Sequence, residues 1–297
     1  MWRRSAAASS SAPSCNPHEP GDLHRQLEHA RPADRWRAPP VRGRPVAQRL
    51  GARQRVHRRQ CRAAVESSEN RGFAAGVNQL LQQCPADYRL VLNTDARPQP
   101  GAITTLHDYM AGHLWVAAAG PRLVDAQGRW IGCHDRFPTV GQELANVLGL
   151  RRSRAHDGLR SKVDWIEGAC MMLSGLAVRE VGLLDTGYFM YNEEVDWCQR
   201  ARTLGWQIAC LPDARVIHYV GKSGSIRRRA QLCSSKIRYQ RLHGSRLGAA
   251  ALAASLVLLN AGLWLASSIR AGWRADRSRS HAYAVAVCAR QLTGQLP

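Results

Sequence analysis

Residues 88–119 read YRLVLNTDARPQPGAITTLHDYMAGHLWVAAA. The apolar run Tyr88–Asn93 is short and bounded by turn-forming residues, which is typical of a buried strand. After two prolines, apolar side chains from Ile103 to Met110 recur at the spacing of one helix face. The run Trp115–Ala119 then predicts a second strand. A strand, a helix and a strand in this order indicate an α/β fold with a mixed, mostly parallel sheet.

The alternation continues toward the C-terminus. We expect strands at Arg122–Val124, Trp206–Cys210 and Val216–Ile217, a turn at Asp125–Gly128, and a helix from Val178 that stops at Gly182. A large α/β domain is therefore predicted for the middle of the chain.

Residues 188–200 read YFMYNEEVDWCQR and place three carboxylates at the expected start of a helix. Acidic side chains in a first turn complement the helix dipole, which is a structural role. A carboxylate held against an apolar wall can instead act as a general base. Both roles are open for Glu193 and Glu194, whereas Asp196 and Arg200 are four residues apart and should form an ion pair along the helix.

The net charge of +20 comes almost entirely from arginine. A charge of this size could allow the protein to bind nucleic acid or an anionic membrane surface. The arginines neither gather on one helix nor alternate with stacking aromatics, so we expect a GC-rich genome as the cause and no nucleic-acid partner.

The nine cysteines form no CxxC pair, which favours reduced thiols in a cytosolic setting over a zinc ribbon or a disulfide framework.

Six segments occur in an order that is informative only when they are taken together. They are Asn70–Asn78, Leu90–Asp95, Val163–Cys170, Tyr188–Arg200, Leu211–His218 and Gly221–Ser223. In order and spacing, residues 66–245 resemble family 2 glycosyltransferases, especially the rhamnosyltransferase-like branch. The resemblance implies the GT-A fold of nucleotide-diphospho-sugar transferases, with its first strands missing here.

The resemblance also implies a function. We expect an inverting, nucleotide-sugar-dependent hexosyltransferase of cell-envelope biogenesis. It would move a sugar, with rhamnose as the first candidate, from a nucleotide diphosphate to a cell-envelope glycan or lipid-linked acceptor.

The donor side of the expected site lies at strand ends, where ligands bind in open α/β sheets. By the resemblance Asp95 is a metal ligand, for Mg²⁺ or Mn²⁺, and oxygen ligands suit such ions. His218 is a second candidate ligand, and a hydrogen-bonded core histidine is equally open. The donor- or nucleotide-binding candidates are Asn70, Gly72, Phe73, Gly76, Asn78, Asn93, Lys222 and Ser223. A plain helix-entry turn and a solvated loop are the alternatives for these residues.

The acceptor side carries the proton chemistry. The family pattern is Glu-Asp with the second carboxylate as base, so the resemblance assigns Glu194 as the base and gives Glu193 a role in holding acceptor hydroxyls. Glutamate in place of aspartate moves the carboxylate oxygens by about 1.5 Å, the length of one C–C bond. Trp165, Gly168 and Ala169 are expected to form the acceptor wall, and a core position is the alternative for Trp165.

Residues 1–65 are polar and basic, which predicts disorder. They lack the apolar strand and the acidic pair with which family members open. One hypothesis is that this segment is translated out of frame, which reading the DNA in its other frames would test. The missing strand and acidic pair leave an alternative open, in which the chain is a catalytically inactive, truncated relative without the nucleotide-binding half.

Residues 246–297 form the third predicted region. Leu247–Ile269 holds no charged residue and is flanked by Arg246 and Arg270, so its length permits a membrane-spanning helix. Shallow insertion and a helix packed on the domain are the alternatives, and a polar, mobile tail should follow from Arg274. We expect a membrane-associated protein at the cytoplasmic face of the bacterial inner membrane.

Overall fold

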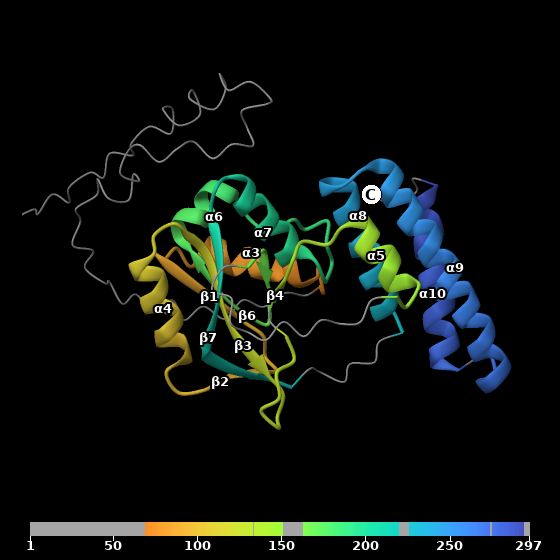
Figure 1. Ribbon diagram of the computed structural model, residues 1–297, viewed down its shortest axis with the longest axis horizontal. Helices are drawn as coiled ribbons and strands as arrows, with labels where there is room; N and C mark the ends of the chain where they lie inside the picture. The colour runs from red at the N-terminus through yellow and green to blue at the C-terminus, as the bar shows by residue number, and fades with distance from the viewer. Residues whose placement is uncertain (1–68, 133, 151–162, 220–225, 274, 294–297) are drawn as a thin grey trace, which may run out of the picture. The chain divides into compact units, whose positions relative to one another are not determined.

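The computed structural model describes residues 69–132, 134–150, 163–219, 226–273 and 275–293 (Figure 1). The predictions for residues 1–65, and those for Lys222 and Ser223, lie outside the described residues.

One five-stranded sheet forms the centre of the α/β fold. Its strands are β1 (Tyr88–Leu92), β2 (Ala96–Pro98), β3 (Val116–Val124), β6 (Cys170–Ser174) and β7 (Gln207–His218), in the order β1-β6-β3-β7-β2. A separate ribbon pairs β4 (His134–Asp135) with β5 (Trp165–Ile166). The predicted strand positions are confirmed for β1, β3 and β7.

The prediction of a mostly parallel sheet is wrong. The described sheet is mixed, and β3 with β7 is its one parallel pair. β6 runs antiparallel to both β1 and β3, and β2 runs antiparallel to β7. The prediction assumed that each strand follows a crossover helix. No helix lies between β1 and β2 or between β5 and β6, so β2 and β6 need not take the parallel direction that a crossover gives.

The sequence predicted two separate strands in the region of β3 and two in the region of β7. In the structure β3 and β7 are each one continuous strand with an irregularity. Between Pro121 and Arg122 the β3–β7 register shifts, since Pro121 faces Leu211 and Arg122 faces Arg215. The extra residues of β7 are accommodated as a bulge, which keeps both strands in the sheet.

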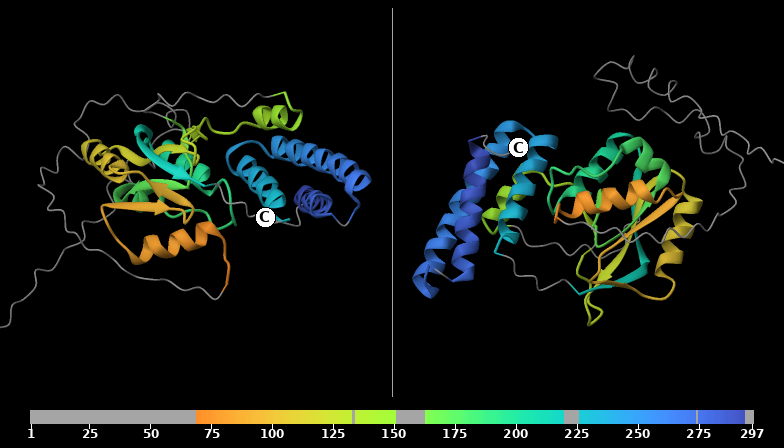
Figure 2. Two further views of the ribbon diagram at one scale, coloured as in Figure 1. Left: turned by 90° about the horizontal axis from the view of Figure 1, so that it is seen from below. Right: turned by 180° about the vertical axis from the view of Figure 1, so that it is seen from behind.

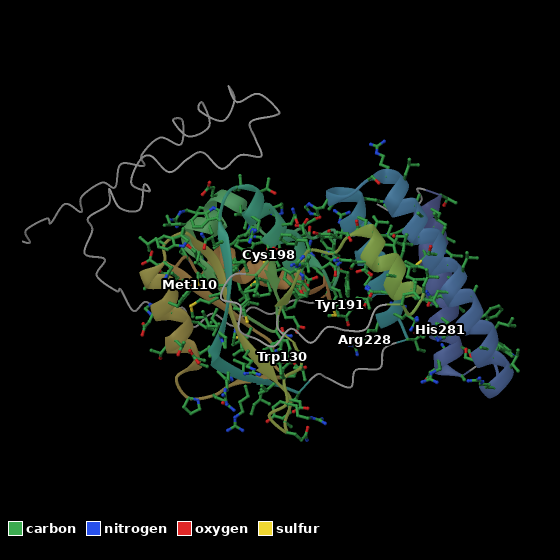
Figure 3. The ribbon with its side chains drawn as sticks, viewed as in Figure 1. Met110, Trp130, Tyr191, Cys198, Arg228 and His281 are labelled. Carbon is green, nitrogen blue, oxygen red and sulfur yellow. The ribbon has the colours of Figure 1, made fainter. Side chains whose placement is uncertain are left out.

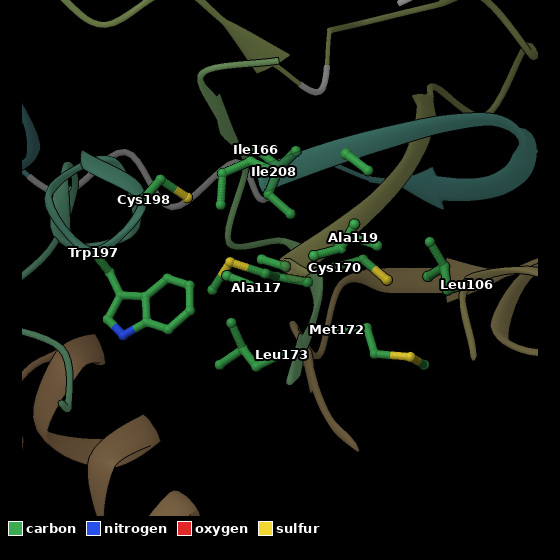
Figure 4. Packing of buried hydrophobic residues seen from close by; sticks show 14 of the residues in the cluster. Leu106, Ala117, Ala119, Ile166, Cys170, Met172, Leu173, Trp197, Cys198 and Ile208 are labelled. Carbon is green, nitrogen blue, oxygen red and sulfur yellow. The ribbon is translucent and has the colours of Figure 1, made fainter. Parts of the chain in front are cut away.

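Helices pack on both faces of this sheet. They are α3 (Phe73–Gln83), α4 (Ala102–Gly112), α6 (Gly175–Val181) and α7 (Glu193–Thr203). In the left view of Figure 2, α3 and α4 lie on opposite sides of the strands. Trp197 and Cys198 of α7 are fully buried near Ile166, Ile208 and Leu173 (Figure 4). The core therefore holds α7, and with it the acidic motif, against the sheet.

Four further helices form a second cluster. They are α5 (Val140–Val147), α8 (Arg228–His243), α9 (Arg246–Ala271) and α10 (Asp276–Leu292). Buried residues of α8, α9 and α10 pack together, with Leu144 and Val147 of α5 against them. The expected mobile tail is wrong for residues 276–292, which form α10 alongside α9. Its buried face carries Ser278, His281 and Gln291, so an apolar pattern could not reveal it.

Candidate functional site

Asp95 and His218 meet at one end of the sheet. The turn after β1 carries Asp95, and the pairing of β2 with β7 sets Ala96 opposite His218. The backbone N–H of Tyr219 donates to the carbonyl of Asp95 across 2.9 Å. His218 Nε2 consequently lies 3.3 Å from Asp95 Oδ1. The two predicted metal ligands are therefore adjacent, as a shared metal site needs them to be.

This pair fits part of a divalent-ion site. Nδ1 of His218 is buried and has no hydrogen-bond partner, and Nε2 faces Asp95, so this imidazole is not held by hydrogen bonds at both ring nitrogens. No group of three or more His, Cys, Asp or Glu side chains in the described ranges could hold a metal ion. The protein would supply two ligands, and phosphate oxygens and water the others, as is common for Mg²⁺.

The loop before α7 has an unusual backbone. Tyr191 and Asn192 have φ angles of 74° and 69°, and neither is a glycine. Two consecutive left-handed residues persist only where the surroundings hold them. The N–H of Phe73 donates to the carbonyl of Phe189 across 2.8 Å, and Ser235 Oγ donates to the carbonyl of Met190 across 2.8 Å. Tyr191 lies between the strand-bearing part of the chain and the C-terminal helices (Figure 3).

The two glutamates at the start of α7 differ in their electrostatics. Glu193 is buried, and burial together with the neighbouring charge of Glu194 raises its pKa to about 8. Burial also raises the pKa of Glu194, but hydrogen bonding from backbone N–H groups, including those of Gly168 and Val195, opposes this rise. Oε2 of each glutamate is buried without a hydrogen-bond partner. Both carboxyls therefore hold their protons more strongly than an exposed glutamate does, and Glu194 has more backbone N–H groups that favour its charged form.

The predicted acceptor wall joins the two halves of the site. The N–H of Asn93 donates to the carbonyl of Ala169 across 2.9 Å. Gly168 directly precedes Ala169. A Cβ added to Gly168 would lie 3.5 Å from Phe73 Cε1 and 3.8 Å from Glu194 Cβ. The segment Gly168–Ala169 thus contacts the turn that leads to Asp95 on one side and Glu194 on the other.

Trp165 is partly buried beside this segment. Its Nε1 donates to the carbonyl of Arg136 across 3.1 Å, and its ring packs near Tyr188, Val195 and Tyr239. These contacts also give the Arg136–Pro138 segment a structural role.

The candidates in the Asn70–Asn78 loop separate into two groups. Asn70 Oδ1 accepts from the N–H of Gly72, and Phe73 contacts the acidic loop through its backbone. Asn78 is buried, and its side chain both accepts from the N–H and donates to the carbonyl of Leu184, at 2.9 and 2.8 Å. Both polar atoms of Asn78 are thus used to fix α3, while a Cβ on Gly76 would meet no atom within 4 Å.

One face of α8 contacts the acidic motif, and sequence reasoning missed it. Arg238 donates to Asp185 Oδ2 across 2.7 and 3.1 Å and lies over the ring of Tyr188. Tyr239 Oη contacts Gln199, and His243 Nε2 lies 2.7 Å from Asp196 Oδ1. The helical spacing of Ser235, Arg238, Tyr239 and His243 was the available signal.

The predicted ion pair between Asp196 and Arg200 is confirmed, at 2.9 Å. Burial alone would raise the pKa of Asp196, but the hydrogen bond from His243 and the charge of Arg200 lower it overall. Arg200 also donates to the carbonyls of Val181 and Leu183. Asp196 therefore has a structural role in fixing α7.

Comparison with known proteins decides the family. The family described as "Glycosyltransferase like family 2" matches residues 43–238. This chain belongs to that family. The match confirms the resemblance to family 2 glycosyltransferases that the sequence predicted. It begins upstream of residue 66, in a part of the chain that the structure does not describe.

The curated relatives of this family 2 member are sugar transferases. An N-acetylglucosaminyl-diphospho-decaprenol L-rhamnosyltransferase of Mycobacterium tuberculosis is 28% identical over 182 residues, which are 54% of this chain and 59% of that protein. The low-salt glycan biosynthesis hexosyltransferase Agl10 of Haloferax volcanii is 28% identical over 46% of this chain and 45% of that protein. The rhamnosyltransferase WbbL of Escherichia coli is 26% identical over 49% and 57%. The chain thus spans about half the length of the relatives that it matches.

Two solved structures are similar at low identity. The mannosyltransferase PcManGT of Pyrobaculum calidifontis, in complex with GDP-Man and Mn²⁺, has a TM-score of 0.44 and 15% identity over 78% of this chain and 69% of that one. GalNAc-T7 with UDP, GalNAc and Mn²⁺ has a TM-score of 0.44 and 14% identity over 78% of this chain and 46% of that one.

Proposed function

We propose that this chain transfers a sugar from a nucleotide-diphosphate donor to a hydroxyl acceptor by a single inverting displacement. The observation that carries the proposal is the pair of contacts at Gly168–Ala169, which bring the turn bearing Asp95 and the start of α7 into one region. Transfer needs charge compensation at the leaving diphosphate and a base at the attacking hydroxyl. The two ends of this region carry residues suited to these two tasks.

Asp95 and His218 would hold a divalent ion, Mg²⁺ or Mn²⁺, on the donor side. When bound, such an ion would neutralise charge that develops on the leaving diphosphate. The residues themselves contribute placement, since the β2–β7 pairing fixes both side chains at the sheet end. The candidate contacts for the nucleotide are Asn93, which is two residues before Asp95, and the Asn70–Phe73 loop.

Glu194 would remove the proton of the attacking hydroxyl. Hydrogen bonding from backbone N–H groups favours its charged form against the effect of burial, whereas burial and the neighbouring charge of Glu194 raise the pKa of Glu193 to about 8. A protonated Glu193 can donate a hydrogen bond to an acceptor oxygen. The pair therefore divides into a base and a positioning group.

Rhamnose is the first candidate for the donor sugar, because two of the relatives named above are rhamnosyltransferases. A lipid-linked or cell-envelope glycan is the proposed acceptor, which would place the chain at the cytoplasmic face of the inner membrane. The names of the Mycobacterium tuberculosis and Haloferax volcanii relatives support an acceptor of this class.

The test is an assay of the full chain with a panel of nucleotide sugars, including dTDP-rhamnose, a polyprenyl-diphosphate sugar acceptor and Mn²⁺ or Mg²⁺. The proposal requires release of the nucleoside diphosphate and an acceptor product of inverted anomeric configuration. Absence of turnover and of nucleotide binding with every donor would instead support the inactive relative. A product of retained configuration would contradict the assignment of Glu194.

A further inference from the structure

The outer side of α9 is apolar along its whole length. From Arg246 to Arg270 this helix has a mean hydropathy of 1.9 and is the one described helix long and apolar enough to cross a membrane. Its exposed residues recur every three or four positions on one face, which we call the outer stripe: Leu247, Ala251, Ala254, Leu258, Gly262, Leu265 and Ile269. Leu247, Leu258 and Ile269 are 85%, 74% and 78% exposed.

In the second half of the same helix, the inner side is polar where it meets α8 and α10. Asn260 is fully buried and accepts from Arg229 Nε across 2.6 Å. Ser278 is also fully buried, and its Oγ donates to Ser267 Oγ across 3.1 Å, while His281 lies beside Asn260. The first half of α9 buries Leu252 and Leu256, but in the second half polar side chains face inward and leucines face outward, which is the reverse of the usual arrangement in water. It is expected where the surroundings are apolar.

The charges around the outer stripe point to the identity of those surroundings. Between residues 226 and 297 the sequence has twelve lysines and arginines but one acidic residue, Asp276. Arg246 and Arg270 are exposed at the two ends of α9, and Trp264 and Trp273 are exposed near its second half. Basic residues and tryptophans beside an apolar helix face fit the headgroup region of an anionic lipid bilayer.

The packing of α8 argues against a spanning orientation. Arg229 of α8 contacts Asn260 near the middle of α9, and its neighbours Arg227 and Arg228 are exposed. If α9 crossed a bilayer with α8 attached, these arginines would lie near its centre, at a cost of about 2.5 kcal/mol or more each. A helix that lies parallel to the surface leaves them in water (Figure 1 shows α8, α9 and α10 packed together).

We propose that the outer stripe of α9 lies flat in the headgroup region of an anionic lipid leaflet, while α8 and α10 remain on its aqueous side. The protein would then bind the membrane by shallow insertion together with electrostatic attraction. This surface is independent of the transferase chemistry, so either proposal can fail without the other.

The test measures sedimentation of the full-length protein with phosphatidylcholine vesicles, with and without phosphatidylglycerol. We expect binding to the anionic vesicles that weakens with added salt and is reversed by alkaline carbonate. Replacing both Leu258→Glu and Leu265→Glu should lower the partition coefficient at least about tenfold. The matched control Leu204→Glu alters an exposed leucine at the end of α7 and should bind like the unaltered protein.

Several results would overturn the proposal. They are failure to bind either vesicle, equal binding to neutral vesicles, resistance to carbonate as shown by spanning helices, or unaltered binding by the double variant. A concentration-dependent dimer that the double variant abolishes would show that a second copy of the chain covers the stripe. Circular dichroism of each variant verifies that the fold is retained.

Discussion

The backbone N–H of Asn93 donates to the carbonyl of Ala169 across 2.9 Å. Asn93 begins the turn that carries Asp95, and Ala169 follows Gly168, which packs toward Glu194. One hydrogen bond thus joins two motifs whose bonded residues are 76 positions apart in the sequence. It gives a structural reason why Asp95 and Glu194 could act on the same donor.

Asp95→Asn should weaken metal-dependent donor binding. The substitution keeps the side-chain size but removes the negative charge beside His218, so we expect a loss of about a hundredfold in nucleotide affinity with Mn²⁺. Calorimetry with dTDP or UDP measures it. Asp108→Asn changes an exposed aspartate and is the matched control. Equal nucleotide affinity of the two variants would remove Asp95 from the donor site.

Gly72→Ala should disrupt the loop before α7, whereas Gly76→Ala should not. Gly72 has a φ of 90°, and an added Cβ would lie 2.3 Å from the carbonyl oxygen of Phe189. We expect a loss of about 2–4 kcal/mol in the free energy of unfolding, measured in urea. Gly76 is helical with no atom near its Cβ, so alanine there should be neutral or stabilising. Equal effects of the two substitutions would contradict the geometry.

Glu193→Gln should change how stability depends on pH. The folded-state pKa of Glu193 is raised to about 8, so its stabilising contribution is fully present below the pKa of the unfolded chain and is lost as pH rises toward 8. Glutamine cannot ionise, and the variant should gain stability relative to the natural protein as pH rises from about 5 to 8, by of order 1 kcal/mol per pKa unit. Urea unfolding at a series of pH values measures the difference. A constant difference would show that Glu193 ionises normally.

Asp196→Asn should have the opposite dependence. The pKa of Asp196 is lowered in the folded protein, so the stability it contributes is present above the unfolded pKa and is lost as pH falls through the folded value. Near neutral pH we expect a loss of about 2–3 kcal/mol, since Arg200 and His243 lose a buried partner. The loss should shrink below about pH 4. An effect that is the same in acid would exclude a charged Asp196.

Local patterns in the sequence were sufficient for much of the fold. The apolar run of β1, the helix face of α4 and the glycine stop at Gly182 each depend on neighbours in the chain. Strand direction does not depend on neighbours in the chain, because β6 pairs with β1 and β3 through contacts between residues far apart in sequence. α10 was missed for another reason, since its buried Ser278 and His281 carry no hydrophobic signal.

The candidate site divides in the same way. The family resemblance named both Asp95 and His218 as candidate metal ligands, and the structure sets the two side chains 3.3 Å apart. The contacts of α8 could not be predicted from the sequence, because Arg238 and His243 meet Asp185 and Asp196 only through the packing of the second helix cluster. Asn78 resembles a ligand-binding residue in its motif, yet the fold uses its amide to hold Leu184.

The central claim is that Asp95 and Glu194 serve one transfer reaction in different ways. The most direct measurement compares donor binding and transfer rate for Glu194→Gln and Asp95→Asn in the same assay. We predict that Glu194→Gln binds the nucleotide sugar within about threefold of the natural protein but loses transfer by about a thousandfold or more, whereas Asp95→Asn loses donor binding itself. Full transfer activity in Glu194→Gln, or unaltered donor binding together with full activity in Asp95→Asn, would contradict the account.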